Sequence, residues 1–485
     1  MIFTEDNMNI LYVASECAPF ASSGGLGDVM GALPKFVKQI KPKYNVELIM
    51  PLYGQIGEKH RAKLSHVCNL HFKLSWRESG ASVYKLCEDG VNYYFIENHR
   101  YFERGRLYGE YDDCERFALF CRAVIEFIRQ NEVRPNVIHA NDWQAAGVIL
   151  YLKTAFSSEF NLSEIKTLFT IHNIEYQGKF NLGVLGDVFG IDEKYQDVFE
   201  FDGAANLLKG ALIASDYVNT VSPNYRNELQ YDFFAFGLAN IISSIKHKTC
   251  GIINGIDYDE YSPTVGSDIY ARYDSSTADS GKRQNKLSLQ KELGFPSCEG
   301  TPLLVMVTRL AKGKGIELLI HILDELLSEN IQLAILGTGE AEYESVLNLA
   351  ARKHENFKAI LSFDRTLAKK MYAGADIFLM PSKSEPCGLA QMIACSYGAV
   401  PIVRSVGGLC DTIIPYGEPS ANGFRFDKYN AHELLYTVKR ALNIYTDKEK
   451  WRELRTSAMH SDFSWEQSAE KYISIYKDLT KKETK

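Results

Sequence analysis

The stretch "ILYVASECAPFASSGGLGDVMGALPK", residues 10–35, decides the fold of the first half of the chain. Its apolar run Ile10–Ala14 predicts a buried strand, and apolar residues at helical spacing from Leu26 onward predict a helix. Between them, Gly24 and Gly25 let a ligand approach the backbone closely, and the N–H groups at a helix start favour an anion. A tight turn from strand to helix explains the two glycines equally well. The arm before them contains no Lys or Arg.

Short apolar runs continue to alternate with longer amphipathic stretches, such as Arg116–Arg129, through the first half of the chain. Near-continuous apolar runs are typical of strands buried on both faces of a parallel sheet, so this half is predicted to be a doubly wound α/β domain. The predicted strands are Ile10–Ala14, Val46–Met50, Tyr93–Ile96, Val137–Ala140, Leu168–Ile171, Val218–Val221 and Ile252–Ile253.

A polar stretch, residues 258–286, interrupts this rhythm and is interpreted as a linker with irregular structure. Beyond it the rhythm restarts and predicts a second doubly wound domain, and Trp465–Leu479 has the spacing of a closing helix. The expected domains are residues 1–257 and 258–460, followed by a C-terminal helix at 461–485. Because ligands of such sheets bind at the carboxyl ends of the strands, we expect a cleft between the two domains. The predicted strands of the second domain are Leu303–Val307, Leu333–Leu336, Ala359–Leu361, Ile377–Met380 and Val400–Val403.

The composition excludes several classes of partner. The 485 residues carry a net charge of −7 and no basic stripe, which argues against nucleic acid as the main partner. The ten cysteines are scattered, with no C-x-x-C pair and no cluster with histidine, so we expect free thiols in a reduced compartment and no metal. The first residues are polar and acidic, and no apolar run reaches the ~18 residues of a membrane span. We therefore expect a cytoplasmic protein without a membrane partner.

Two loops of the second half carry charged residues directly after predicted strands. In "VTRLAKGKGIELL", Arg309 offers a planar fork and Lys314 a point charge, a pair that suits a diphosphate. In "MPSKSEPCGLAQ", Glu385 can accept hydrogen bonds from sugar hydroxyls, and a helix starting near Leu389 can hold a phosphate at its N–H groups. Solvated cations and a helix-capping glutamate are the alternatives.

Polar residues also follow two predicted strands of the first half. The stretches "HANDWQ" and "TIHNIEYQGKF" place His139, Asp142 and His172 near the carboxyl ends of these strands, on the side of the expected cleft. A single histidine is more often structural, but several polar residues at successive strand ends favour a site. In "VRSVGGLCDT", Gly407 and Gly408 repeat the glycine pair of the first domain, again between strand and helix.

Taken together, these stretches resemble bacterial glycogen synthases and plant starch synthases, which are retaining glycosyltransferases that use ADP-glucose. The resemblance implies the GT-B fold, with two Rossmann-like domains facing a cleft and the C-terminal helix packing back on the N-terminal domain. It places the glucan acceptor on the N-terminal domain and the nucleotide sugar on the C-terminal domain. The matching motifs are "ASECAPFASSGGLGDVMGALPK", "HANDWQAA", "TIHNIEYQGKF", "TVSP", "INGID", "VTRLAKGKG", "PSKSEPCGLAQM", "VRSVGGLCDT", "NGFRF" and "DFSWEQSAEKY".

The resemblance also implies a role for each candidate residue. Arg309 and Lys314 would bind the donor diphosphate, and Glu385 would hold hydroxyls of the transferred glucose. His172 would lie near the 6-hydroxyl and Asp142 near the reacting sugar, which makes these five the expected catalytic residues. The expected donor contacts are Ser22, Gly24, Gly25, Asp28, Asn254, Phe363, Cys387, Gly388, Leu389 and Ala390. The expected acceptor contacts are Tyr108, Asn173 and Gln177.

The implied reaction moves glucose from ADP-glucose to the non-reducing 4-hydroxyl of glycogen or a malto-oligosaccharide, with retention and without a cofactor. Front-face attack and a covalent route through Asp142 both remain open, as do two other functions: a UDP-glucose enzyme of the same fold and a catalytically weak glucan- or nucleotide-binding homologue. Two departures bear on the donor. The family usually has a lysine before the glycine pair, where this chain has Ser22, and a tyrosine against the adenine, where it has Phe363.

Overall fold

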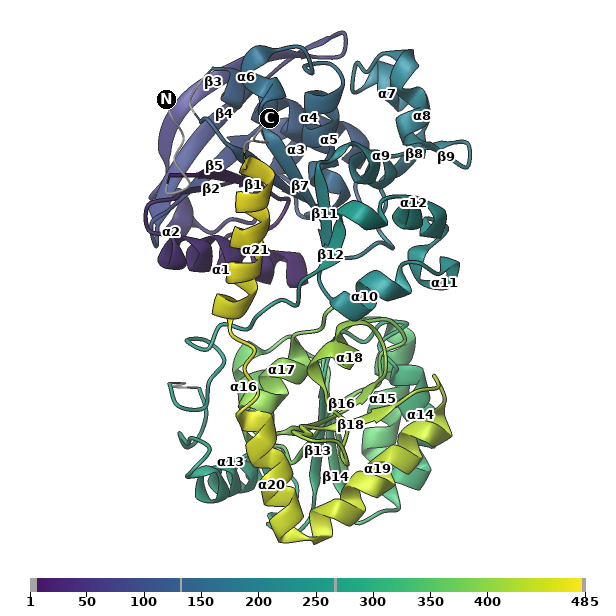
Figure 1. Ribbon diagram of the computed structural model, residues 1–485. Coiled ribbons are helices and arrows are strands. Elements are labelled where there is room, and N and C mark those ends of the chain that lie inside the picture. Colours follow the sequence, from purple (N-terminus) through teal and green to yellow (C-terminus); the bar gives the residue numbers. More distant parts are fainter. Residues whose placement is uncertain (1–6, 131–132, 266–267, 482–485) are drawn as a thin grey trace. The chain divides into compact units, whose positions relative to one another are not determined.

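The computed structural model describes residues 7–130, 133–265 and 268–481, and the chain divides into two compact units (Figure 1). Each unit contains a largely parallel sheet with helices between its strands, which confirms the predicted α/β class. Within the described residues, no helix combines the length and the apolar character needed to cross a bilayer.

Unit 1 comprises Met1–Ile252 and Trp465–Lys485. Its strands are β1 (Asn9–Val13), β2 (Asn45–Pro51), β3 (Ser65–Leu74), β4 (Arg77–Glu88), β5 (Val91–Glu97), β6 (Val137–Asn141), β7 (Lys166–Ile171), β8 (Lys179–Asn181), β9 (Glu200–Phe201), β10 (Ala204–Asn206), β11 (Tyr217–Thr220) and β12 (Thr249–Gly251). The main sheet has the order β12-β11-β7-β6-β1-β2-β5-β4-β3, in which the pairs of β3, β4 and β5 are antiparallel and the others parallel. The carboxyl ends of β1, β6 and β7 therefore lie side by side at one edge.

The apolar runs predict the parallel strands of this sheet but not the strands with one solvated face. The strand predicted at Ile252–Ile253 is wrong, because β12 ends at Gly251. The hairpin of β3 and β4 has no continuous apolar run, since buried and exposed side chains alternate along it.

The helices of unit 1 cover its main sheet (Figure 1). They are α1 (Gly25–Ile40), α2 (Glu58–Arg61), α3 (His99–Phe102), α4 (Asp113–Arg129), α5 (Asp142–Lys153), α6 (Phe160–Ser163), α7 (Val184–Asp187), α8 (Gln196–Phe199), α9 (Leu207–Ala214), α10 (Pro223–Glu228), α11 (Asp232–Ala235), α12 (Ala239–Ser244) and α21 (Trp465–Thr480), with short 3-10 turns at Glu193–Tyr195 and Lys246–Lys248. Helix α1 begins at the second glycine of the pair, and its predicted apolar face is buried.

Helix α21 is tied to the sheet by buried hydrogen bonds. The Tyr476 hydroxyl donates to the Tyr12 hydroxyl at 2.9 Å and lies 2.8 Å from Nδ1 of His139. On the other side of the ring, Nε2 of His139 lies 2.5 Å from Oγ1 of Thr170. Burial lowers the pKa of His139 well below its ordinary value, so this histidine is neutral. His139 is a buried residue within β6, so it has a structural role in the sheet and does not belong to the polar residues at the strand ends, where the sequence placed it.

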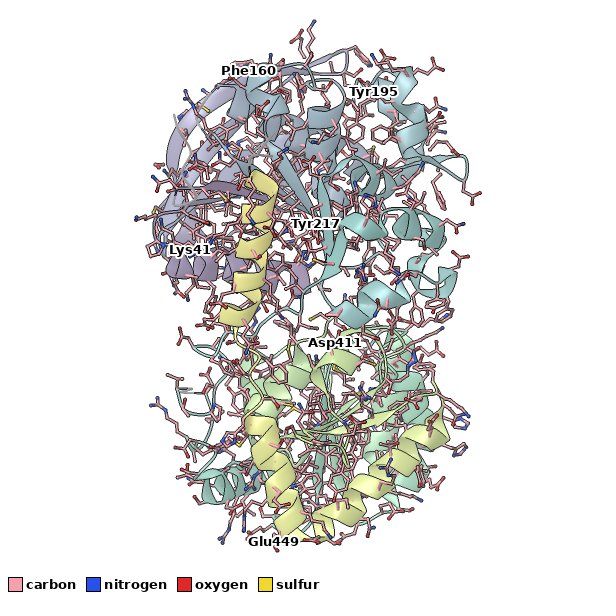
Figure 2. All side chains as sticks on the ribbon, viewed as in Figure 1. Lys41, Phe160, Tyr195, Tyr217, Asp411 and Glu449 are labelled. Atoms are coloured by element: carbon pink, nitrogen blue, oxygen red, sulfur yellow. The ribbon has the colours of Figure 1, made fainter. Side chains whose placement is uncertain are left out.

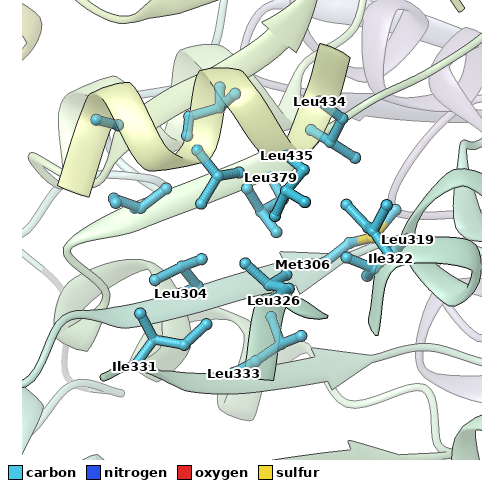
Figure 3. Packing of buried hydrophobic residues seen from close by; sticks show 14 of the residues in the cluster. Leu304, Met306, Leu319, Ile322, Leu326, Ile331, Leu333, Leu379, Leu434 and Leu435 are labelled. Carbon is cyan, nitrogen blue, oxygen red and sulfur yellow. The ribbon is translucent and has the colours of Figure 1, made fainter. Parts of the chain in front are cut away.

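Unit 2 comprises Ile253–Ser464. Its strands are β13 (Leu303–Val307), β14 (Gln332–Leu336), β15 (Phe357–Ile360), β16 (Ile377–Met380), β17 (Val400–Arg404) and β18 (Phe424–Phe426). Its helices are α13 (Ala278–Glu292), α14 (Ile316–Leu327), α15 (Ala341–Lys353), α16 (Arg365–Gly374), α17 (Ala390–Ser396), α18 (Gly407–Thr412), α19 (Ala431–Thr446) and α20 (Lys448–Met459). The sheet is parallel, with the order β15-β14-β13-β16-β17-β18. Figure 3 shows part of its core, in which Leu304 and Leu333 of the strands pack with Leu319, Leu326 and Leu434 of the helices.

Helix α13 begins within the stretch that the sequence pattern assigns to an irregular linker and covers its last part, residues 278–286. Its inward face is polar: Lys282 Nζ donates to the carbonyl of Tyr397 at 2.9 Å, and Lys286 Nζ pairs with Asp376 Oδ2 at 2.6 Å. A helix held by buried polar groups lacks the apolar periodicity by which helices are predicted. The linker interpretation is therefore wrong for residues 278–286.

We predict that Tyr476→Phe lowers the free energy of unfolding by about 1–3 kcal/mol, because it leaves buried polar atoms of Tyr12 and His139 without a partner. Urea unfolding of the full chain measures this change. Tyr436→Phe is the matched control, since Tyr436 is exposed on α19 and should change stability little. Equal stabilities of the two variants would contradict the structural role of this network.

Candidate active site

Asp142 and His172 are adjacent at the carboxyl ends of β6 and β7. Asp142 begins α5 with a left-handed backbone, φ +56°, which an aspartate tolerates better than most residues. Its Oδ1 accepts the backbone N–H of His172 at 2.8 Å, and its carboxylate also accepts the N–H of Asn173. The structure therefore brings this predicted pair together.

Burial controls the charge of both side chains. It raises the pKa of Asp142 from 3.8 to about 7, although the two N–H groups oppose the shift. It lowers the pKa of His172 from 6.5 to about 3, so the ring is neutral near pH 7. His172 Nε2 lies 2.9 Å from Asn141 Oδ1, while Asn141 Nδ2 donates to backbone carbonyls. Nε2 thus carries the ring proton, which makes Nδ1 of His172 a hydrogen-bond acceptor.

A carboxylate holds the glycine loop before α1. Buried Glu16 accepts the N–H groups of Ser23 at 2.5 Å and Gly24 at 3.2 Å, and the Ser23 hydroxyl donates to it at 2.7 Å. Two N–H groups that a phosphate could use are therefore occupied from within the protein. The outer side of the loop is open, since Ser22 and Gly25 are exposed and a Cβ added at Gly25 would meet nothing within 4 Å.

Tyr108 contacts the segment that follows β1. Its hydroxyl lies 2.7 Å from Ser15 Oγ, and burial together with the nearby Glu16 charge raises the pKa of Tyr108 well above its ordinary value. Asp28 lies half-buried in the first turn of α1. Ser15 and Glu16, at the end of β1, therefore connect the predicted acceptor residue Tyr108 with the predicted donor loop.

A cavity of about 570 Å³ opens in unit 1. One wall is the ring of Trp143, and a Cβ at Gly178 (φ +61°) would lie only 2.6 Å from that ring, so glycine is required there. The predicted residue Gln177 lines the cavity and accepts a hydrogen bond from Asn206 at 2.7 Å, whereas Asn173 does not line it. The lining residues are Trp143, Glu175, Tyr176, Gln177, Gly178, Lys179 and Phe236.

In unit 2, Lys314 Nζ and Glu385 Oε2 form an ion pair at 2.7 Å. Ser382 Oγ donates to the same oxygen at 3.2 Å. Glu385 is nearly buried, whereas the Lys314 side chain is 25% exposed, so the pair borders solvent. Arg309 is exposed and forms no side-chain hydrogen bond or ion pair with any described residue. Its guanidinium is therefore available to an anion.

The loop of Glu385 is fixed by the second glycine pair. The N–H of Gly408 donates to the Glu385 carbonyl at 3.1 Å, and a Cβ on Gly407 (φ +47°) would lie 1.9 Å from that oxygen. Arg404 Nη2 donates to the carbonyl of Lys383 at 3.0 Å and holds the preceding part of the loop. This glycine pair begins α18 after β17, as predicted, and it supports the Glu385 loop.

Four predicted donor residues of unit 2 present groups that a ligand could use. Leu389 precedes α17 and Ala390 begins it, so the first-turn N–H groups have no partner within the helix. Asn254 is buried, and its Oδ1 has no hydrogen-bond partner in the described chain. Phe363 is 82% exposed after β15, as a residue that stacks on a ligand would be.

Cys387 and Gly388 shape this region from inside. Gln391 Nε2 donates to the carbonyls of both, at 3.2 Å and 3.0 Å. Burial raises the pKa of the Cys387 thiol to about 12, so it stays protonated. Across the described ranges, no group of three or more His, Cys, Asp or Glu side chains is placed to hold a metal ion.

Several residues at these positions are missing from the sequence predictions, among them Glu16, Trp143 and Phe236. Glu16 lies just beyond the first strand, but only the folded loop shows that its carboxylate binds the glycine turn. Trp143 adjoins Asp142, and this adjacency is a signal that could have identified it. Phe236 has no local signal, since its loop reaches the cavity only through the tertiary fold.

Two doubly wound α/β units, each with polar side chains at the carboxyl ends of its strands, are the architecture expected of the GT-B class. Comparison with known families refines this class. A family model described as "Starch synthase catalytic domain" matches residues 9–244, and one described as "Glycosyl transferases group 1" matches residues 292–456.

Relatives cover nearly the whole chain. It is 42% identical over 481 residues to a glycogen synthase from Geobacillus thermodenitrificans, covering 98% of this chain and 99% of the relative. It is 43% identical to a glycogen synthase from Bacillus cereus, covering 97% and 100%. The chain therefore belongs to the glycogen and starch synthase family of glycosyltransferases.

Solved structures agree with this assignment. The catalytic domain of starch synthase IV from Arabidopsis thaliana, bound to ADP and acarbose, is 32% identical with a TM-score of 0.89, covering 98% of this chain and 99% of that one. Sucrose-phosphate synthase from Thermosynechococcus elongatus has a TM-score of 0.61 at 18% identity, covering 97% and 99%, a likeness of fold alone.

We predict that Asp142→Asn changes the pH dependence of stability. Between pH 3.8 and about 7 the folded chain holds a proton that the unfolded chain has lost, so raising the pH through this range destabilises the fold. The asparagine variant has no titrating carboxyl at this position, so its stability does not fall for this reason as the pH rises. The difference in free energy of unfolding between the variant and wild type should therefore shift in favour of the variant by roughly 1–3 kcal/mol from pH 5 to pH 8.

Urea unfolding of both chains at the two pH values measures this gain. The unfolded-state titration of the histidines is common to both chains and cancels in the difference. A difference between the two chains that does not vary with pH would contradict the raised pKa of Asp142.

Proposed function

We propose that this chain transfers glucose from ADP-glucose to the non-reducing 4-hydroxyl of an α-1,4-glucan, with retention of configuration. The observation that carries the proposal is the 2.7 Å ion pair of Lys314 and Glu385, in loops that also carry the exposed Arg309. These loops offer cations for a diphosphate and a carboxylate for sugar hydroxyls. The likeness to a starch synthase bound to ADP supports ADP-glucose as the donor.

The donor side of the proposal rests on charge. As the bond between C1 of glucose and the phosphate oxygen breaks, the leaving ADP gathers negative charge. The fork of Arg309 and the point charge of Lys314 would stabilise it, with N–H groups at the start of α17 as further donors. Glu385, oriented by Lys314, would accept hydrogen bonds from glucose hydroxyls. The ring of Phe363 would stack on the adenine.

The acceptor side rests on the cavity of unit 1. Trp143, Tyr176 and Phe236 give it aromatic walls on which the C–H faces of a sugar chain can pack. Gln177 supplies a polar group at the same wall. Neutral His172 adds an acceptor, Nδ1, for a sugar hydroxyl. Such a mixture of aromatic faces and few polar groups suits a neutral glucan.

Retention is proposed to occur by front-face attack. The acceptor 4-oxygen bonds to C1 as the bond from C1 to the phosphate oxygen breaks, and the acceptor proton passes to the leaving phosphate. The covalent route through Asp142 has less support, because that carboxylate already accepts the N–H groups of His172 and Asn173. These bonds stabilise the oxygens and weaken them as nucleophiles.

The alternatives differ in donor or in turnover. UDP-glucose would use the same cations, and Ser22 in place of the family's usual lysine keeps this alternative open. A binding homologue without turnover would have no use for the conjunction of Arg309, Lys314 and Glu385. The expected partners are ADP-glucose and a glucan, without nucleic acid or membrane, and the cytoplasmic location stays a prediction.

We predict faster turnover with ADP-glucose than with UDP-glucose, measured as initial rates on a glycogen primer. Arg309→Ala should lower kcat by about 10²–10³-fold, because transition-state charge loses its forked donor. Its melting temperature should not change, because Arg309 is exposed. Arg309→Lys is the matched control, which keeps the charge without the fork and should lose less activity. Faster turnover with UDP-glucose would refute the donor assignment, and no turnover with either donor would favour the binding homologue.

We predict that Ser22→Lys lowers the KM for ADP-glucose several-fold, because it adds a cation at the exposed side of the glycine loop. Ser22→Gln adds a chain of similar length without the charge and should leave the KM near that of wild type. If both variants, or neither, change the KM, the charge at residue 22 does not act on the donor.

A further inference from the structure

Trp76 is exposed at the tip of the hairpin of β3 and β4, which runs toward α7 in Figure 1. The side chain is 68% exposed, although indole is among the most costly side chains to leave in water. Ser75, the other residue of the turn, adopts a left-handed backbone with φ +55°. The chain therefore uses a tight turn to present a large aromatic ring to solvent.

The ring is held in one orientation. Its Nε1 donates to Oδ1 of Asp187 at 2.8 Å, and the Arg77 guanidinium lies over the ring, 4.4 Å from its centroid. Arg77 in turn donates to Oδ2 of Asp187 at 2.9 Å and to its carbonyl at 2.6 Å. Since Arg77 covers one face of the ring, the exposed area lies on the other face and the edge. A fixed ring loses little conformational entropy when a ligand packs on it.

Anchoring the hairpin does not require the indole to be exposed. The ion pair of Arg77 with Asp187 and a hydrogen bond from Ser75 Oγ to the carbonyl of Gly186, at 2.7 Å, already join the turn to α7. A smaller or more buried side chain would serve an anchor equally well. Anchoring the turn therefore does not account for the exposed face of the ring.

The surroundings of the ring favour a carbohydrate over a protein. Protein-binding sites combine an aromatic anchor with a contiguous apolar patch, whereas Trp76 is bordered by Ser75, Arg77, Gly186 and Asp187. One aromatic face beside a guanidinium and a carboxylate matches a sugar ring, which has an apolar C–H face and hydroxyls at its rim. Hydrogen bonds from Trp76 and Arg77 lower the pKa of Asp187, so it remains a charged acceptor.

We propose that Trp76, Arg77 and Asp187 form a surface site for an α-glucan chain, separate from the cavity lined by Trp143. The site rests on the proposed function only in taking the same class of polymer. A long glucan held there stays at high local concentration near the enzyme, whereas an acceptor of two or three glucose units gains nothing. The site would thus make glycogen a better acceptor than a short oligosaccharide without taking part in transfer.

Binding is tested without turnover. Migration of the full chain in native gels containing glycogen gives a dissociation constant, and β-cyclodextrin, a closed α-1,4-glucan ring without a non-reducing end, serves as a soluble competitor. Trp76→Ala should weaken glycogen binding about five-fold or more, and Trp76→Phe, which keeps a ring, should weaken it less. Phe160→Ala is the matched control, since Phe160 is 80% exposed at the surface of the same unit (Figure 2) and should change nothing.

Kinetics separate a binding role from a structural one. In Trp76→Ala the KM for glycogen should rise while kcat and the KM for maltotriose remain those of wild type. Unchanged glycogen binding would overturn the site, as would a lowered melting temperature with parallel losses on both acceptors. A change of oligomeric state in light scattering without a change in glycogen binding would assign Trp76 to a protein interface instead. Weakened glycogen binding in a chain without transferase activity would retain the site and refute only the proposed function.

Discussion

The constraint on which the rest depends is that loops at the carboxyl ends of parallel strands must pair their own backbone groups. At the ends of β1 and β6 the partners are carboxylates: Glu16 accepts two N–H groups of the glycine loop, and Asp142 accepts those after β7. In unit 2, Arg404 and Gly408 donate to carbonyls of the Glu385 loop. The side chains that a ligand could meet at these sheet edges therefore also hold the backbone of the loops in place.

Candidate site residues therefore fall into two kinds: those that also hold the loop backbone and those that do not. Changing Glu16 or Asp142 leaves backbone N–H groups of these loops without their partner, so a loss of activity in such variants mixes a change of loop geometry with a change of chemistry. Arg309 is exposed and bonds to no described side chain, so its loss reports on the ligand alone. Lys314 is intermediate, because its removal also leaves Glu385 without its cation. Activity data on these positions can be interpreted only with stability data beside them.

The parts of the fold that bury apolar surface were predictable from the sequence, and the parts that rely on polar burial were not. The parallel strands and α21 show apolar runs or helical spacing, which follow directly from burial. Helix α13 is bound through Lys282 and Lys286, and the hairpin of β3 and β4 is solvated on one face, so neither shows that signal. Among the candidate site residues, motif order pointed to Glu385 and Lys314, which the structure pairs, whereas Phe236 reaches the cavity only through tertiary structure.

The carboxylate beneath the glycine loop limits what that loop can offer to an anion. A phosphate charge about 4 Å from the Glu16 charge would be repelled by roughly 4 kcal/mol at an effective dielectric constant near 20. No Lys or Arg of the described chain forms an ion pair with Glu16, and Ser22 supplies no cation to offset it. The loop can therefore contribute its open outer side and the first N–H groups of α1, but not positive charge. A diphosphate at this loop would therefore need its compensating positive charge from residues outside the loop.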